Sequence, residues 1–150
     1  MRERLRAAFA VDLNPVLQAA IAPVSKHQSL GTGDIDQMTQ VQLQPSTSEL
    51  VWLPSIREVF GAINRYTDTE DIATLEGYAP FQYEAYRGNN GLSRNAKAVK
   101  TWNGGYRTYW LRSAYILNKT DFCTVQADGS LWSTDKGASE SHGIAPAFCL

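Results

Sequence analysis

The sequence predicts an α+β fold, in which a small, mostly antiparallel sheet is combined with short helices and long loops. Three observations carry this prediction. Short runs of β-prone residues, separated by turn residues, follow one another in the last third of the chain. Residues 2–22 instead place apolar side chains at helical spacing, and polar segments separate these regions. At 150 residues, the chain is long enough for a single domain with one core.

We expect this domain to have three parts: a helical hairpin over about 2–22, a mixed middle over 50–100 and a β-rich end over 106–150. In the hairpin, Asn14 is placed to cap a second helix whose first position is Pro15. This hairpin would cover one side of the sheet. Its apolar stripes are predicted at Leu5, Ala8, Phe9, Leu13, Val16, Leu17, Ala20 and Ile21.

The segment 25–49 is polar and predicts a long loop with one short strand near 38–43. A short strand is expected at 51–53. Ser55 and Glu58 then have the spacing of a capping box, in which each side chain accepts a hydrogen bond from a free N–H group of the first helical turn. This structural role is sufficient for Glu58, so we do not assign it a catalytic one.

Loops and turns dominate the stretch that follows. Residues 64–79 predict a surface loop, residues 81–86 one short helix, and residues 102–105 a turn that leads into a strand beginning at Tyr109.

The β-rich end contains the strongest local signals. Tyr109, Leu111 and Ser113 alternate with Trp110 and Arg112, so one of the two sets is expected to face a core.

The Asp128-Gly129 pair predicts a type I′ turn between strands at about 121–126 and 130–134. Residues 145–150 predict a final strand that docks into the sheet.

Composition excludes several classes of partner. The formal net charge of −1 gives no basic excess for nucleic acid. No apolar run approaches the ~20 residues needed to cross a bilayer, so membrane insertion is not expected. The charged residues after Met1 leave no visible signal peptide.

Two cysteines, Cys123 and Cys149, fall on predicted strands. Two buried free thiols are favoured over a disulfide between neighbouring strands, because free cysteine packs like a small hydrophobic residue. A metal site built on this pair alone is not expected, since zinc normally takes four ligands.

No catalytic constellation or cofactor site stands out, and we expect the protein not to be an enzyme. His27 and His142 both fall in polar segments and are interpreted as solvated loop histidines. The acidic runs do not have the ligand spacing of an EF-hand.

Arg112 would be costly to bury in a central strand unless it is paired. We interpret it as a structural arginine that binds backbone carbonyls or a carboxylate such as Glu58. An alternative is that it anchors an anionic ligand. Together with Arg112, the residues to which we assign structural roles are Ser55, Glu58 and Trp110.

Several of these motifs together resemble the DUF6273 family. They are the tryptophan-leucine-arginine-serine run at 110–113, the Phe122 strand, the Asp128-Gly129 turn, the glycine-x-x-proline-alanine-phenylalanine run at 143–148, and upstream segments at 17–24 and 53–61. Two residues depart from the family pattern, Ala114 at a usual proline and Ala145 at a usual arginine, so no role of that arginine is carried over.

The resemblance implies a domain of bacterial and phage proteins with a C-type-lectin-like fold, similar to sulfatase-modifying factors. In that fold a first strand normally pairs with the last, yet this chain opens on a helix. Either the chain is the tail end of a longer protein, or a loop or partner chain covers the edge of the final strand. The calcium-ligand motifs of sugar-binding C-type lectins are not matched.

The resemblance also implies a function, because the late loops of such folds often contact a host receptor or glycan. We therefore expect a structural or recognition domain of a phage or prophage virion, such as a tail, fibre or decoration component, which self-associates or binds a neighbouring protein. The loop residues expected to bind the ligand are Tyr115, Asn118, Lys119, Trp132, Asp135, Lys136, Glu140 and His142.

Two alternatives place the chain elsewhere. One is a carbohydrate- or protein-binding module of the bacterial cell surface. The other is an oxidoreductase of the sulfatase-modifying type, which is disfavoured because its reactive cysteine pair would lie here within apolar strands.

Overall fold

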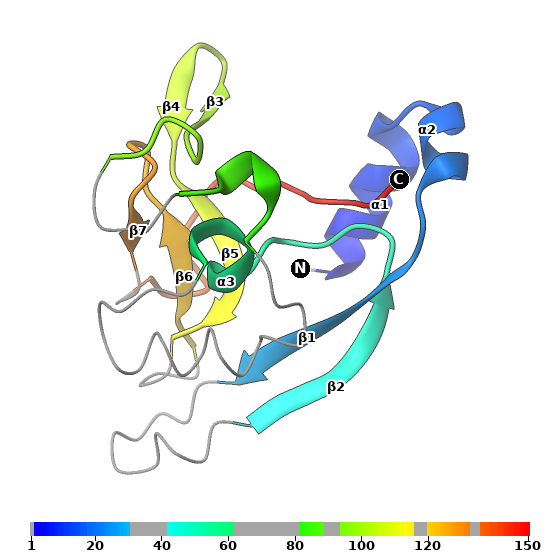
Figure 1. Cartoon of the computed structure of the whole chain (residues 1–150), viewed down its shortest axis with the longest axis horizontal. Coiled ribbons are helices and arrows are strands. Elements are labelled where there is room, and N and C mark those ends of the chain that lie inside the picture. The colour runs from blue at the N-terminus through cyan, green and yellow to red at the C-terminus, as the bar shows by residue number, and fades with distance from the viewer. Residues whose placement is uncertain (1, 31–41, 62–81, 89–93, 116–119, 133–135) are drawn as a thin grey trace.

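The computed structural model describes residues 2–30, 42–61, 82–88, 94–115, 120–132 and 136–150. Short helices and small antiparallel sheets make up the described part of the chain, so the predicted α+β class is confirmed (Figure 1). The loop predicted over 64–79, most of the strand predicted near 38–43 and the start of the helix predicted over 81–86 lie outside the described residues.

The N-terminal hairpin forms as predicted from α1 (Arg2–Asp12) and α2 (Pro15–Ala20). The Asn14 side chain accepts a hydrogen bond of 2.8 Å from the Val16 N–H, and Pro15 opens α2. The Gln18 amide joins the two helices, because it donates to the carbonyls of Phe9 and Leu13 at 3.1 and 2.7 Å.

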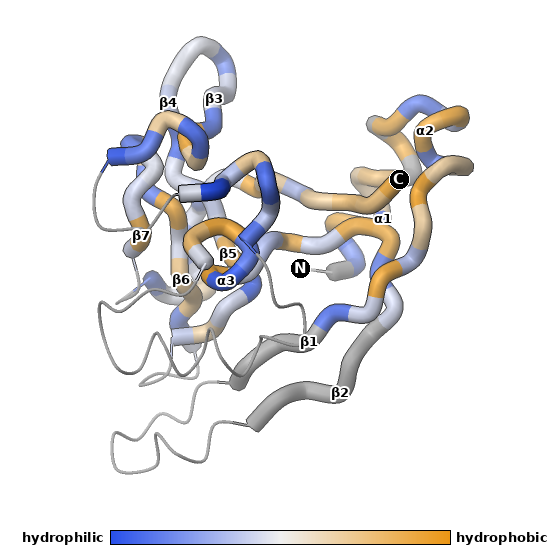
Figure 2. Tube along the Cα trace, in the orientation of Figure 1, coloured by the Kyte–Doolittle hydropathy of each residue, from blue (hydrophilic) through white to orange (hydrophobic). Residues whose placement is uncertain are grey.

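The predicted apolar stripes of this hairpin are only partly buried. Leu5 packs against Leu53 and Trp110, and Ile21 is also buried, whereas Val16 is 80% exposed. The stripe predicted for α2 is therefore wrong at Val16. Figure 2 shows apolar residues along α2 and the chain that follows it.

The polar segment after α2 forms a hairpin, so the prediction of a long loop over 25–49 is wrong. Here β1 (Val24–Leu30) pairs antiparallel with β2 (Gln42–Glu49). The register shifts after Lys26, so that His27 lies opposite two residues of β2, Pro45 and Ser46. A bulge of this kind accommodates proline, which has no N–H for the ladder. It also places His27 in a strand rather than in a loop.

A three-stranded sheet carries the core, in the order β5 (Tyr109–Ala114), β6 (Phe122–Val125) and β7 (Leu131–Trp132). All six residues of β5 are buried, so the prediction that one alternating set faces a core was too narrow. Tyr109 and Leu111 join the main core, whereas Trp110 packs in a second cluster with Leu5. Layers on both sides therefore cover β5.

The main core packs a short helix against this sheet. Ile56, Val59 and Phe60 of α3 (Ile56–Phe60) are buried, and a 3₁₀ helix, η2 (Glu84–Tyr86), adds Tyr86. Only this last turn of the helix predicted over 81–86 is described as helical.

The hairpin between β6 and β7 is confirmed, but its turn is not type I′. That turn needs φ > 0 at both central residues, and Asn103 is the one non-glycine residue with positive φ in the described part of the chain. Instead, the Gly129 N–H donates to the Gln126 carbonyl and the Gln126 N–H donates to Ser130, which leaves a three-residue loop that ends on Gly129 at φ 84°.

A type I′ turn does occur at Asn103-Gly104, where the φ angles are 50° and 75°. It joins β3 (Lys100–Trp102) to β4 (Gly105–Arg107), a two-stranded hairpin that projects from the rest of the molecule (Figure 1). The turn was predicted, whereas its two short strands were not.

The strand predicted over 145–150 does not form. The segment instead makes single β-bridges, from Ala147 to Trp52 and from Cys149 to Ala22, after Gly143 has paired with Tyr109. No one strand offers it a continuous partner, so it crosses from the main sheet to the helical hairpin (Figure 1).

The two thiols therefore differ. Both are free, as predicted, but Cys123 is buried in β6 whereas Cys149 is exposed, so the expected burial is wrong for Cys149.

The Gly129 turn provides a stability test. A Cβ on Gly129 would lie 2.0 Å from the Asn95 carbonyl oxygen, whereas a Cβ on Gly88, at the same φ of 84°, would meet nothing within 4 Å. We expect Gly88→Ala to lower the free energy of unfolding by about 1–2 kcal/mol through backbone strain. Gly129→Ala should lower it by at least about 2 kcal/mol more, because the Asn95 backbone must move. Urea unfolding of both variants measures the difference, and equal losses would contradict the turn described here.

Candidate functional site

A groove of about 770 Å³ lies between the β3–β4 hairpin and residues 141–145. Its size is within the range of ligand-binding sites. The described residues that line it are Lys100, Thr101, Trp102, Tyr106, Arg107, Thr108, Tyr109, Ala127, Ser141, His142, Gly143, Ile144 and Ala145.

Large apolar side chains of the groove are exposed to an unusual degree. Trp102 is 70% exposed, Tyr106 is 69% exposed and Ile144 is 47% exposed. Trp102 pairs with Gly105 across the hairpin, which has no side chain to cover the indole ring. Clustered exposed aromatic rings beside a groove are typical of recognition surfaces.

Backbone and side-chain hydrogen bonds fix the base of the groove. The Gly143 N–H donates to the Thr108 carbonyl at 2.9 Å, and the Trp110 N–H donates to the Gly143 carbonyl at 3.0 Å. The Tyr109 hydroxyl donates to the Ala98 carbonyl at 2.9 Å, and burial raises the pKa of this hydroxyl, which therefore stays protonated. The groove thus stands on the buried β5 strand.

His142 lies at one border of the groove and is not a solvated loop histidine, so that interpretation is wrong. Its side chain is 16% exposed, and its Nε2 atom lies 3.0 Å from Glu140. The imidazole ring packs edge-on against Trp110, with 4.7 Å between the ring centres.

Four of the predicted loop residues form a chain of contacts that ends at the groove. Lys136 lies 5.9 Å from the Trp132 ring centre and 3.4 Å from Glu140, which in turn contacts His142. Trp132 is 43% exposed.

The other four predicted loop residues are not part of this chain. Tyr115 is half-buried, and its N–H donates to the Asp121 carbonyl. Asn118, Lys119 and Asp135 lie outside the described residues. Trp102 and Tyr106 were missed as site residues, although an Asn-Gly turn flanked by aromatic residues was a signal for an exposed hairpin.

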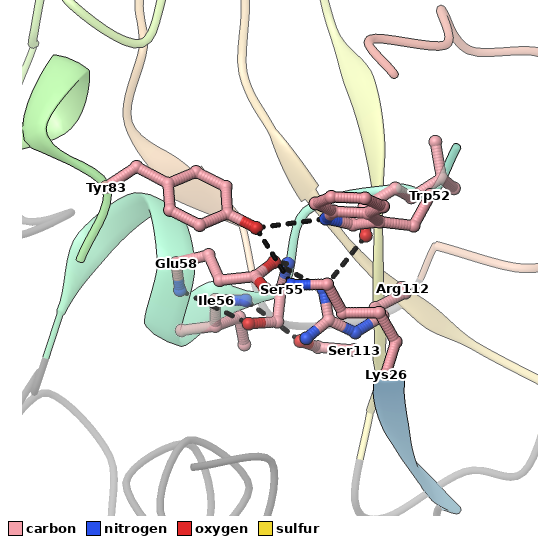
Figure 3. Close-up of polar contacts among 9 residues, drawn as sticks. Lys26, Trp52, Ser55, Ile56, Glu58, Tyr83, Arg112 and Ser113 are labelled. Carbon is pink, nitrogen blue, oxygen red and sulfur yellow. Dashed lines mark hydrogen bonds and ion pairs between the residues drawn. The ribbon is translucent and has the colours of Figure 1, made fainter. Parts of the chain in front are cut away.

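A second polar feature is a buried ion network centred on Glu58 (Figure 3). Glu58 is fully buried; one carboxylate oxygen accepts from Lys26 Nζ at 2.6 Å and the other accepts from the Arg112 guanidinium. Arg112 also donates to the Leu53 carbonyl at 3.0 Å. The contacts expected for Arg112, a carboxylate partner in Glu58 and a backbone carbonyl, are therefore present.

Aromatic side chains complete the surroundings of Lys26. Its ammonium lies 4.2 Å from the centre of the Trp52 ring, a cation–π contact, and 3.2 Å from the Tyr83 hydroxyl. The Trp52 indole N–H donates to the same hydroxyl at 2.9 Å. Burial, followed by the charge of Glu58, raises the pKa of Tyr83. Lys26 was missed because a lysine in a polar segment is typical of a solvated surface.

The capping box predicted at α3 is also confirmed, and it is part of the same network. Ser55 accepts from the Glu58 N–H at 3.2 Å, and the Ser55 N–H donates to the Glu58 carboxylate at 2.9 Å. Ser113 of β5 accepts from the Ile56 N–H at 2.9 Å. Helix cap, ion network and central strand are therefore joined.

This network holds the structure together and offers little chemistry. Both oxygens of Glu58 are engaged, and its pKa is lowered: burial acts to raise it, but the opposing attraction of Arg112 and Lys26 is stronger. The carboxylate thus stays ionised and is not poised as a proton acceptor. In the part of the chain that the structure describes, no cluster of three histidine, cysteine or acidic residues could hold a metal ion.

Glu58→Gln tests how much the network stabilises the fold. It leaves Lys26 and Arg112 buried without their anion, so we expect the free energy of unfolding to fall by about 3–5 kcal/mol. Ser55→Ala, which removes one capping partner, should cost about 1 kcal/mol. Glu84→Gln, in the exposed pair of Glu84 with Arg87, is the matched control and should cost less than about 1 kcal/mol. Urea unfolding distinguishes the three, and a Glu58→Gln loss no larger than the control would contradict this role.

The same variant has a pH signature. Because the folded pKa of Glu58 lies below its ordinary value of 4.5, the ion pairs stabilise fully above about pH 4.5. That stability is lost as the pH falls from there through the folded pKa. Unfolding measured from pH 7 downwards should show this acid loss in the wild type and a smaller loss in Glu58→Gln.

Comparisons with known proteins place the chain in a family. No curated protein and no solved structure matches it. Among the described residues, none of the helices has the length and apolar character needed to span a bilayer. One family model, described as Domain of unknown function (DUF6273), matches residues 1–150. The chain therefore belongs to the DUF6273 family.

Proposed function

We propose that the chain is a non-enzymatic recognition domain whose ligand binds in the groove between the β3–β4 hairpin and residues 141–145. The observation that carries this proposal is the exposure of Trp102 and Tyr106 beside that groove. Leaving two aromatic rings in water forgoes the stabilisation of burying them, and binding a ligand recovers it.

The late loops border this groove through His142 and continue towards Trp132. Recognition surfaces commonly combine rigid aromatic anchors with adaptable polar neighbours of this kind. The loop face predicted from the sequence is thus kept in the proposal as the rim, with the aromatic hairpin at the centre.

The biological setting is proposed from the family resemblance. We propose a phage or prophage virion component of tail, fibre or decoration type, with a C-type-lectin-like fold and with a host-surface glycan or protein as ligand. The alternative is a binding module of the bacterial cell surface. A sulfatase-modifying oxidoreductase is disfavoured, because it would need a reactive cysteine pair. Here Cys123 is buried whereas Cys149 is exposed.

Self-association fits the virion setting and has its own support. Val11 is 82% exposed, Val16 is 80% exposed and Leu150 is 77% exposed. The bridge between Ala22 and Cys149 brings the terminal segment beside the chain that leaves α2. Exposed apolar residues that gather in one region commonly mark a contact with another protein.

Trp102→Ala tests the groove. We expect it to weaken glycan or protein binding by tenfold or more, because a central aromatic anchor commonly contributes about 2 kcal/mol. Trp132→Ala, which removes the half-exposed rim tryptophan, should weaken binding much less. Glycan arrays identify ligands, and isothermal titration calorimetry then compares the variants. Loss with Trp132→Ala but not with Trp102→Ala would move the site to the loops, and no binding to glycans or surface proteins would refute the proposal.

Light scattering over a range of concentrations tests self-association. We expect an oligomer for the wild type and a monomer for the Val11→Lys/Val16→Lys double variant, because charges at the contact would have to be desolvated. Arg4→Lys, an exposed change on α1 that keeps the charge, is the control. A wild-type monomer at all concentrations would favour the cell-surface module over the virion component.

A further inference from the structure

The charges of the groove are unbalanced in a chain that is nearly neutral overall. Lys100 and Arg107 lie directly opposite each other in β3 and β4. None of the described lining residues is aspartate or glutamate. Since acidic residues number 15 and basic residues 14 in the chain, this local cationic character is not a consequence of composition.

Neither cation is neutralised within the described part of the chain, where Lys100 and Arg107 take part in none of the ion pairs. Lys100 Nζ lies 5.4 Å from the centre of the Tyr86 ring, which leaves its charge uncompensated. Glu140, which contacts the lining residue His142, is also engaged by Lys136. The groove therefore offers two positive charges to a ligand.

These charges lie next to the aromatic anchor. Residues opposite each other in an antiparallel pair, and residues two apart in one strand, project to the same side. Lys100, Trp102 and Arg107 therefore share one side of the hairpin. The Arg107 guanidinium extends over Gly105, the residue opposite Trp102, with its central carbon 3.8 Å from where a Cβ would lie.

Together these features specify a ligand chemistry. Sugar rings present flat C–H faces to aromatic rings, and their hydroxyls match side chains that both donate and accept, here Thr108 and Ser141. Carboxylates or phosphates would pair with the two cations. Nucleic acid fits less well, since binding to phosphate backbones normally uses many cations and a basic domain.

We propose that the groove binds an acidic glycan, with the Trp102 ring against a sugar face and Lys100 and Arg107 against its anionic groups. This inference rests on the proposed recognition function, because it names the ligand class of the same groove.

The test compares one sugar polymer with and without its charge. Calorimetry with the full chain would use oligogalacturonate, its neutral methyl ester, a glucose-substituted poly(glycerol phosphate) teichoic acid and a thymidine oligonucleotide. We expect one of the two acidic glycans to bind at least about tenfold tighter than the neutral ester. The acidic glycan that binds identifies the anionic group that is recognised, carboxylate or phosphate. Binding should weaken between about 0.1 and about 1 M NaCl, where the screening length falls from about 10 to about 3 Å.

Matched variants locate the effect. Arg107→Gln and Lys100→Gln should each weaken the binding of the acidic glycan about tenfold and leave the binding of the neutral ester unchanged. Arg4→Gln removes the same charge from exposed α1 and should change neither by more than about twofold.

Each other outcome overturns the inference in a distinct way. Equal affinity for acid and ester, lost in Trp102→Ala, would refute an acidic ligand and leave the recognition function standing. Tighter binding of the oligonucleotide would assign the cations to nucleic acid. Failure of both acidic glycans to bind would refute the inference, and failure of every glycan and protein ligand would remove the recognition function as well.

Discussion

The structure depends on one buried carboxylate. Glu58 connects β1 through Lys26, β5 through Arg112 and its own helix cap through Ser55. Lys26 and Arg112 are far from Glu58 in the sequence, and no continuous sheet joins β1 to β5. A hydrophobic contact in the same place would not be directional. Two charge-assisted hydrogen bonds to one carboxylate instead fix the relative orientation of the two strands and α3. The desolvation of the three charges is the cost of this arrangement.

The remaining elements place the groove around this centre. Arg112 and Trp110 lie two residues apart in β5, so the strand that reaches the ion network also supports Gly143 and, through ring contact, His142. The β3–β4 hairpin extends beyond this supported region, which leaves its rings exposed. The fold thus combines a rigid base with an outlying pair of short strands, an arrangement common where loops carry function on a fixed scaffold.

Local rules predicted much of this fold. The Asn14 cap, the capping box of Ser55, the α+β class and the β6–β7 hairpin all follow from short-range spacing, and the structure contains each of them. Two features do not follow from short-range spacing, because distant partners determine them. They are the β1–β2 hairpin and the burial of β5 on both of its sides. In β1, the polar run and the bulge opposite Pro45 conceal the strand. Arg112 was predictable since an arginine in an apolar strand needs a partner, whereas nothing in the neighbourhood of Lys26 distinguishes it from a surface lysine. For the candidate groove, the turn at Asn103 was visible in the sequence, but its position beside residues 141–145 is a tertiary property.

The terminal segment has a consequence for the order in which the chain folds. Its bridges join Cys149 to Ala22, Ala147 to Trp52 and Gly143 to Tyr109, and the first two of these contacts span most of the chain. Closing such long loops costs more conformational entropy than forming the β3–β4 or β6–β7 hairpin. A single β-bridge, rather than a ladder of hydrogen bonds along a strand, offsets the entropy cost of each closure. Topology of this kind slows folding relative to local hairpins and helices. The path of residues 147–149 towards the helical hairpin is therefore completed late, after the surfaces on which it rests.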